Sequence, residues 1–160
     1  MSRFPLEPLY AVREIRLRAL EQALQAAREV RDQAARQHRQ AELRLQEAGE
    51  QRARFAADGW RALFAQGAPS GAATAGYERH LQLLDHRIAQ ARAELDASAQ
   101  ALAEAQAAFD TAAAAWRRSR GKLDAIGTLK QDWLRASRGR SEAREEQGLE
   151  ELLLRPAKPS

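Results

Sequence analysis

A seven-residue repeat of large apolar side chains runs through the second half of the chain. Stepping by seven residues from Leu81 gives an unbroken apolar series: Leu81, Ile88, Leu95, Leu102, Phe109, Trp116 and Leu123. A second series interleaves with it at 4–3 spacing and holds smaller or mixed side chains: Tyr77, Leu84, Ala91, Ser98, Ala105, Ala112, Ser119, Ile126 and Trp133. Two such series share one helix face and form the seam of a coiled coil. The repeat therefore predicts a long helix that buries this face against another helix.

The first half of the chain repeats the pattern with smaller side chains. One series reads Leu20, Ala27, Ala34, Ala41, Ala48 and Phe55. We assign Ala23 and Val30 to the second series, which becomes polar at Gln37 and Arg44, with Leu24, Leu43 and Leu45 beside the seam. Alanine at seam positions lets two backbones approach closely, and polar seam residues fix the register. This half predicts a second helix that is able to pack closely on the first.

Glycine and proline separate the two halves. The run from Gly67 to Gly71 is a loop signal, and Ser70 and Thr74 are candidate N-caps for the helix that follows. A short loop between helices of similar length makes them antiparallel neighbours. We therefore predict an all-α fold, an antiparallel two-helix coiled-coil hairpin over residues 1–138, with helices at about 8–66 and 76–138 and a loop at about 67–75. Folding at this loop predicts three pairs across the hairpin: Phe55 with Leu84, Val30 with Phe109, and Ala23 with Trp116.

Residues 139–160 differ in character and are predicted to form a flexible or short-helical C-terminal tail. Ser141 and Glu142 are suited to capping a short helix. Four leucines then cluster beside acidic residues and before Pro156: Leu149, Leu152, Leu153 and Leu154. Such a tail is either a docking segment or a helix packed on its own hairpin.

Composition excludes several classes of protein. The absence of cysteine excludes a disulfide framework and thiolate sites, and aromatic residues make up only 6% of the chain. The 26 basic and 22 acidic side chains are mixed along the sequence, as on solvated helix faces. No run of about 18 apolar residues occurs, and the first twenty residues lack the apolar region of a signal peptide. We expect a cytoplasmic protein with no direct membrane insertion, peripheral at most to a membrane-bound assembly.

No pattern of residues indicates catalysis. His38, His80 and His86 have no second histidine at i,i+4, and neither a phosphate-binding glycine loop nor a serine elbow is present. We expect no enzyme, no metal and no cofactor. Two interpretations are open for the basic run of Arg117, Arg118, Arg120 and Lys122. It either faces Glu21 and Glu29 across the hairpin or contacts a nucleic-acid backbone.

Apolar residues off the seam form two candidate partner surfaces. One cluster lies at the end of the hairpin that holds the chain termini: Phe4, Leu6, Leu9, Tyr10 and Trp133, with Leu129 and Leu134 nearby. The other lies beside the loop: Trp60, Leu63, Phe64, Tyr77 and Leu83. Exposed aromatic and leucine clusters on a thin protein mark partner surfaces. The alternative is that each cluster is a closing layer of the hairpin core.

Several segments resemble a known family. The opening run from Phe4 to Arg16 (FPLEPLYAVREIR) is similar to the N-terminus of the YscO/FliJ family, the central-stalk proteins of type III secretion and flagellar export. The run Trp60-Arg61-Ala62-Leu63-Phe64, the spacing of Tyr77, Leu81 and Leu84, and an acidic tail resemble the YscO branch.

The resemblance implies a non-enzymatic stalk similar to the γ subunit of rotary ATPases. The terminal cluster would then contact a hexameric secretion ATPase, and the loop-end cluster would contact the cytoplasmic domain of the export gate. Some members also bind chaperones of translocator substrates or the ruler protein. On this reading the chain is a monomeric hairpin that binds no nucleic acid. Two alternatives stay open: a basic coiled-coil module that binds nucleic acid, and a homodimer whose helices pair between chains.

Overall fold

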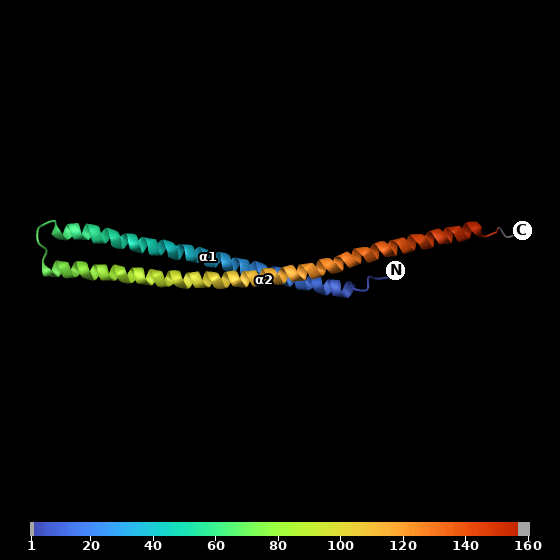
Figure 1. Ribbon diagram of the computed structural model, residues 1–160, viewed down its shortest axis with the longest axis horizontal. Coiled ribbons are helices and arrows are strands. Elements are labelled where there is room, and N and C mark those ends of the chain that lie inside the picture. The colour runs from blue at the N-terminus through green and yellow to red at the C-terminus, as the bar shows by residue number, and fades with distance from the viewer. Residues whose placement is uncertain (1, 157–160) are drawn as a thin grey trace. The chain divides into compact units, whose positions relative to one another are not determined.

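The computed structural model describes residues 2–156 and consists of two helices. Helix α1 spans Glu7–Phe64 and helix α2 spans Gly71–Leu154, joined by a short loop (Figure 1). No strand occurs among the described residues. Contacts between the helices run in opposite directions along the sequence, since Arg52 pairs with Asp85, Arg44 with Glu94 and His38 with Ser98. The predicted all-α antiparallel hairpin is confirmed.

The chain divides into two compact units, and each helix contributes to both. The loop unit is Leu24–Ala112 and contains the connection between the helices. The terminal unit combines the residues up to Ala23 with those from Ala113 onward.

The seam predicted for the second helix is confirmed in both units. The smaller series lies deepest, with Leu84, Ala91 and Ala105 buried in the loop unit and Ser119 and Ile126 buried in the terminal unit. The large series from Leu81 to Leu123 is half-buried throughout. Small side chains at the closest approach of two helices, flanked by larger ones, give the interdigitated packing of a coiled coil.

Of the two residue series predicted for the seam of α1, one is confirmed and the other is wrong. The series from Leu20 to Phe55 is buried or half-buried, with Ala34 and Ala41 in the core. Val30, however, is 60% exposed and Ala23 is exposed too, so their assignment to the seam was wrong. The second series instead consists of half-buried residues one position later: Leu24, Arg31, His38, Leu45 and Arg52.

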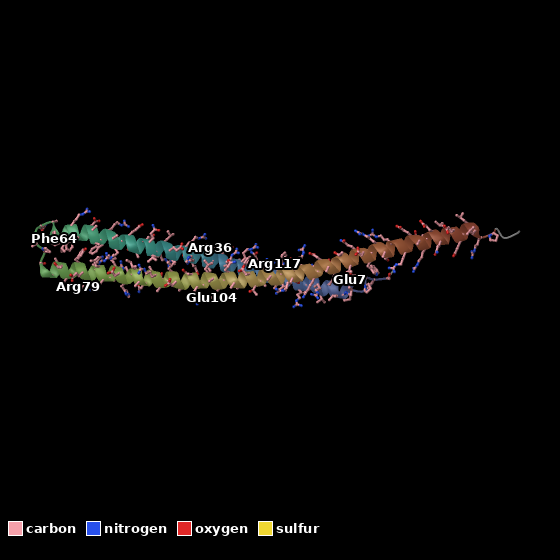
Figure 2. The ribbon with its side chains drawn as sticks, in the orientation of Figure 1. Glu7, Arg36, Phe64, Arg79, Glu104 and Arg117 are labelled. Carbon is pink, nitrogen blue, oxygen red and sulfur yellow. The ribbon has the colours of Figure 1, made fainter. Side chains whose placement is uncertain are left out.

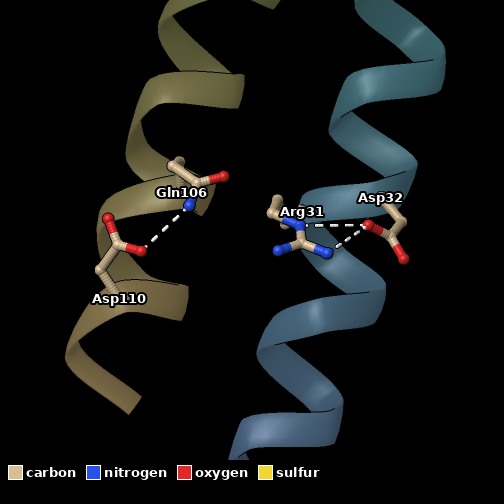
Figure 3. A network of polar contacts seen from close by, with 4 residues as sticks. All are labelled: Arg31, Asp32, Gln106 and Asp110. Carbon is tan, nitrogen blue, oxygen red and sulfur yellow. Dashed lines mark hydrogen bonds and ion pairs between the residues drawn. The ribbon is translucent and has the colours of Figure 1, made fainter. Parts of the chain in front are cut away.

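Long polar side chains are able to hold these positions because their apolar stems lie along the seam while their charged ends reach its edge. The guanidinium of Arg31 lies 4.2 Å from the centre of the Phe109 ring, where Val30 was predicted. It also donates two hydrogen bonds, at 2.9 and 3.1 Å, to the carboxylate of Asp32 (Figure 3). On the facing helix, Gln106 donates to Asp110 at 3.0 Å (Figure 3).

The observed register differs slightly from the predicted one. The Phe55 ring packs against Tyr77 and His80, which precede the predicted partner Leu84 along α2. The indole of Trp116 donates a 3.4 Å hydrogen bond to Glu21, close to the predicted partner Ala23. The arginines and acids on the outer faces of both helices are exposed, including Arg36, Arg79, Glu104 and Arg117 (Figure 2).

Two residues shape the loop between the helices: a glycine with a positive φ and a serine that caps α2. Gly67 lies three residues after the end of α1 and adopts a positive φ of 101°, which only glycine reaches without strain. The hydroxyl of Ser70 accepts a 3.1 Å hydrogen bond from the backbone N–H of Ala73, which confirms Ser70 as an N-cap. Thr74 is instead inside the helix, where its hydroxyl donates to the Ser70 carbonyl.

The end of α2 lies well beyond its predicted position. The helix does not stop near residue 138 but continues through Gly139 and Gly148 to Leu154. Each glycine costs a helix about 1 kcal/mol relative to alanine, which the surrounding Glu, Arg, Ala and Leu residues, all strong helix formers, offset. The predicted tail is thus a continuation of α2 as far as the structure describes it, and all its side chains up to Pro156 are exposed. Residues 157–160 of that tail lie outside the described residues.

Candidate partner-binding surfaces

In the terminal unit, the predicted cluster divides into a core part and an exposed part. Phe4 is buried, and its ring lies 5.8 Å from that of half-buried Trp133, which closes the seam at this end. Tyr10 is half-buried beneath the Lys130 ammonium, 4.9 Å from the ring centre. Leu6 and Leu9 are exposed. The aromatic members therefore build a platform, and the two leucines are the side chains that it offers to a partner.

Two further exposed residues extend this surface along α1. Val12 and Ile15 are 60% and 68% exposed, and with Leu9 they recur every three residues along the helix. Residues at this spacing lie on neighbouring positions of one helix face. Sequence reasoning missed them because the phase of the α1 seam was uncertain there. Buried Leu17, one turn from half-buried Arg13, fixes that phase and places Val12 and Ile15 on the outer face.

An ion pair secures the beginning of α1 in the terminal unit. The Lys130 ammonium lies 2.9 Å and 3.0 Å from the two carboxylate oxygens of Glu7. The hydrogen bond to Glu7 is the main reason that the pKa of Lys130 is raised above its ordinary value of 10.5. Lys130 is thus a cation at neutral pH and continues the large seam series where Leu123 ends it.

In the loop unit, an aromatic stack supports the predicted cluster. The ring of Tyr77 lies 5.4 Å from that of Phe55 and 6.0 Å from that of Trp60. Its hydroxyl donates a 2.9 Å hydrogen bond to the carbonyl of Ala56. Gly59 makes this approach possible, because a Cβ there would lie 3.0 Å from the Tyr77 ring. Tyr77 is therefore part of the hairpin core, as the closing-layer alternative requires.

The remaining loop-end residues differ in exposure. Trp60 and Phe64 pack on each other at 4.6 Å between ring centres, yet are 54% and 45% exposed. Phe64 lies at the last position of α1 (Figure 2). Leu83 is exposed as well, whereas Leu63 is half-buried. An aromatic pair held on a rigid stack and open to solvent has the composition of an interface centre.

The basic run of α2 does not form one surface. Arg120 pairs with Asp124 at 3.3 Å on its own helix. Arg118 and Lys122, which are one turn apart, line a small cleft of about 140 Å³ together with Arg13 and Arg16 of α1. Among the ion pairs of the described residues, none joins the run to Glu21 or Glu29, although Glu21 lies beside the start of the run, where it accepts a hydrogen bond from the indole of Trp116. Because these four side chains point in different directions around the helix, they do not favour a continuous track for a nucleic-acid backbone.

The histidines and carboxylates do not converge. His38 lies between Ser98 and Glu42, at 3.1 Å and 3.0 Å, while His80 packs on the Phe55 ring 4.2 Å away. No group of three or more potential metal-ligating side chains occurs in the part of the chain that the structure describes. In that same part, no helix is long and apolar enough to cross a membrane.

The structure thus belongs to a class of protein: an antiparallel helical hairpin with exposed apolar side chains beside packed aromatic rings. A family model described as YscO-like protein matches residues 1–153, and the chain belongs to this family. Membership indicates a protein related to type III secretion. The solved structure of a proposed YscO homolog, CT670 from Chlamydia trachomatis, is similar in fold, with a TM-score of 0.74 and 15% identity over 96% of this chain and 95% of that one. No curated protein matches the chain significantly.

Proposed function

We propose that the protein is a non-enzymatic stalk of a type III secretion system that links the hexameric export ATPase to the export gate. It acts in the cytoplasm, at the inner-membrane secretion apparatus. The observation that carries the proposal is the presence of an exposed apolar surface in each unit, supported from beneath by side chains that belong to the core. Two such surfaces on one helical hairpin suit a protein that holds two partners.

The terminal unit would contact the ATPase through the outer face of α1. The exposed side chains of this surface are Leu9, Val12 and Ile15 of α1 and Leu6 just before it, and the ion pair between Glu7 and Lys130 fixes the beginning of the helix. Burying the exposed apolar area of these side chains in a partner stabilises the complex by about 25 cal/mol per Å², offset in part by the freedom lost on association. Phe4, Tyr10 and Trp133 act indirectly, because they hold α1 against α2.

The ATPase contact is tested by titrating the protein into the secretion ATPase of the same organism and following ATP turnover and hexamer formation. We expect stimulation by the natural chain and its loss in Leu9→Ser/Val12→Ser/Ile15→Ser. These side chains are exposed, so helicity by circular dichroism should not change. Val30→Ser/Leu43→Ser, on exposed side chains of α1 in the loop unit, serves as the control. Undiminished stimulation by the triple variant would contradict the proposed contact.

The loop unit would contact the cytoplasmic domain of the gate through Trp60 and Phe64. Replacing both with alanine should abolish gate binding in a pull-down or by calorimetry, while the Phe55–Tyr77 stack keeps the loop end folded. Leu83→Ala tests how far the surface extends onto α2. Unfolding of the double variant would mean that these rings belong to the core. Chaperones of translocator substrates or the ruler protein are further candidates for this surface.

A further inference from the structure

A basic groove lies in the terminal unit beside the cluster of Phe4 and Trp133. It has a volume of about 610 Å³, and its lining combines the apolar side chains of Pro5, Trp133 and Leu134 with four arginines and three serines. Among residues 2–156, no ion pair involves Arg138, Arg140 or Arg144. The groove therefore offers unneutralised guanidinium groups around an apolar surface.

The last turns of the same helix have the opposite character. Leu149, Leu152, Leu153 and Leu154 are between 61% and 84% exposed. Glu145, Glu146, Glu150 and Glu151 alternate with them along the helix. A helix this exposed gains nothing from tertiary packing, which is what stabilises most helices in proteins. The acidic leucine segment, residues 145–154, is thus complementary to the groove in both charge and apolarity.

The segment is unable to reach the groove of its own chain. Helix α2 is continuous from Gly71 to Leu154, without a turn at which the chain could fold back. At 1.5 Å per residue, Leu152 lies about 28 Å along the helix from Trp133. Only another molecule is able to bring an acidic leucine segment onto the groove.

We propose that the other molecule is a second copy of this chain, paired antiparallel through residues 134–154 of α2. Within this stretch four arginines come first, at Arg135, Arg138, Arg140 and Arg144, with the single acid Glu142 among them, and four glutamates follow between residues 145 and 151. A two-fold axis near the boundary places the arginines of each copy against the glutamates of the other, and the leucines of each against Trp133 and Leu134 of the other.

This self-complementarity favours a second copy over an unrelated partner. In a symmetric antiparallel pair, the arginines of each copy meet the glutamates of the other. A partner that is only acidic or only basic would match just one of these two groups. The pairing leaves each hairpin intact, unlike a dimer whose α1 and α2 exchange between chains. It covers Trp133 of the terminal cluster but leaves free the exposed side chains proposed for the ATPase and gate contacts, and its test is a mass rather than a binding assay. With only a few helical turns in contact, the pair is expected to be weak, with a dissociation constant on the order of micromolar.

The test is the mass of the full chain by sedimentation velocity and light scattering over a range of concentrations. One chain weighs 17.8 kDa, and we expect the mass to rise towards twice that value at high concentration. Raising the salt from about 0.05 M to about 0.5 M shortens the Debye length several-fold and should shift the equilibrium to the single chain. A single-chain mass at every concentration in low salt would overturn the proposal and leave the groove to another partner.

Charge reversal makes the test specific. Arg138→Glu/Arg140→Glu/Arg144→Glu should give a single-chain mass, and so should Glu146→Arg/Glu150→Arg/Glu151→Arg. Mixing the two variants restores opposite charges across the interface and should restore the double mass. The control Arg39→Glu/Arg87→Glu/Arg92→Glu reverses three exposed charges of the loop unit and should not alter the dimer. A dimer that persists in both reversal variants, or a mixture that stays at single-chain mass, would contradict the pairing.

Discussion

The polar groups of the seam differ between the two units. In the loop unit, the seam holds alanines and polar pairs whose hydrogen-bonding groups find partners, as His38 does with Ser98 and Arg52 with Asp85. In the terminal unit, the seam buries an unpartnered serine hydroxyl, and the outer faces carry exposed leucines and excess positive charge. Between residues 113 and 140, the only acidic residues are Asp124 and Asp132. The loop unit thus satisfies the polar groups of its seam within the chain, whereas the terminal unit leaves one seam hydroxyl without a hydrogen-bond partner.

The largest effect is expected from the core of the loop unit. Leu84 is 4% exposed, and its truncation to alanine should lower the free energy of unfolding by about 2–4 kcal/mol, because it leaves a cavity at the seam. Its neighbour Leu83 lies on the outer face, so Leu83→Ala should change stability by less than about 0.5 kcal/mol. Urea unfolding followed by circular dichroism measures both. Equal losses would mean that the seam is not where the structure places it.

Two serines at equivalent seam positions should respond with opposite signs. Ser98 contacts the His38 ring at 3.1 Å and donates to the Leu95 carbonyl, so Ser98→Ala should cost about 1 kcal/mol. Ser119 is buried with its hydroxyl unpartnered, so Ser119→Ala should stabilise the terminal unit by about 0.5–1 kcal/mol. Thermal unfolding of the two variants is the measurement. Destabilisation of similar size in both variants would contradict this difference between the units.

Replacing two glycines of α1 with alanine should give a smaller difference in stability. Gly49 has no neighbour within 4 Å of an added Cβ, so Gly49→Ala should raise stability by about 0.5–1 kcal/mol through helix propensity. At Gly59 the added Cβ would lie 3.0 Å from the Tyr77 ring, so the gain should be cancelled as the ring shifts. Melting temperatures compare the two. A full gain at Gly59 would show that the aromatic platform is loose.

The smallest effect is the pH dependence of the ion pair between Lys130 and Glu7. Because the folded-state pKa of Lys130 is raised, its contribution to stability is complete below the ordinary value of 10.5 and is lost as pH rises through the folded-state value. The difference in melting temperature between the natural chain and Lys130→Gln should be constant from neutral pH to about 10 and then shrink. A difference that already shrinks between pH 7 and 9 would contradict the assignment.

Much of this fold could be read from the sequence because large side chains mark a seam unambiguously. Every large member of the α2 series is half-buried as predicted, and the loop signals were sufficient to place Gly67 and Ser70. The second series of α1 could not be read in the same way. Alanines fit either side of a seam, and the true positions are held by Arg31 and His38, whose polarity argues against burial.

The surfaces were predicted less completely than the fold. Sequence composition identified Trp60, Phe64, Leu6 and Leu9 as exposed apolar residues, but it could not separate them from the core aromatics Phe4 and Tyr77. That distinction depends on the phase of each helix, which the structure supplies. The same phase reveals Val12 and Ile15. The end of α2 was missed because a glycine is a weaker signal than the helix formers on both sides of it.

The central claim is that two surfaces serve two partners, and the most direct test crosses two variants with two assays. The Leu9→Ser/Val12→Ser/Ile15→Ser chain and the Trp60→Ala/Phe64→Ala chain are each tested for stimulation of the secretion ATPase and for binding to the gate domain. We predict that the first loses only ATPase stimulation and the second only gate binding. Loss of both activities in either variant, or of neither in both, would contradict the account.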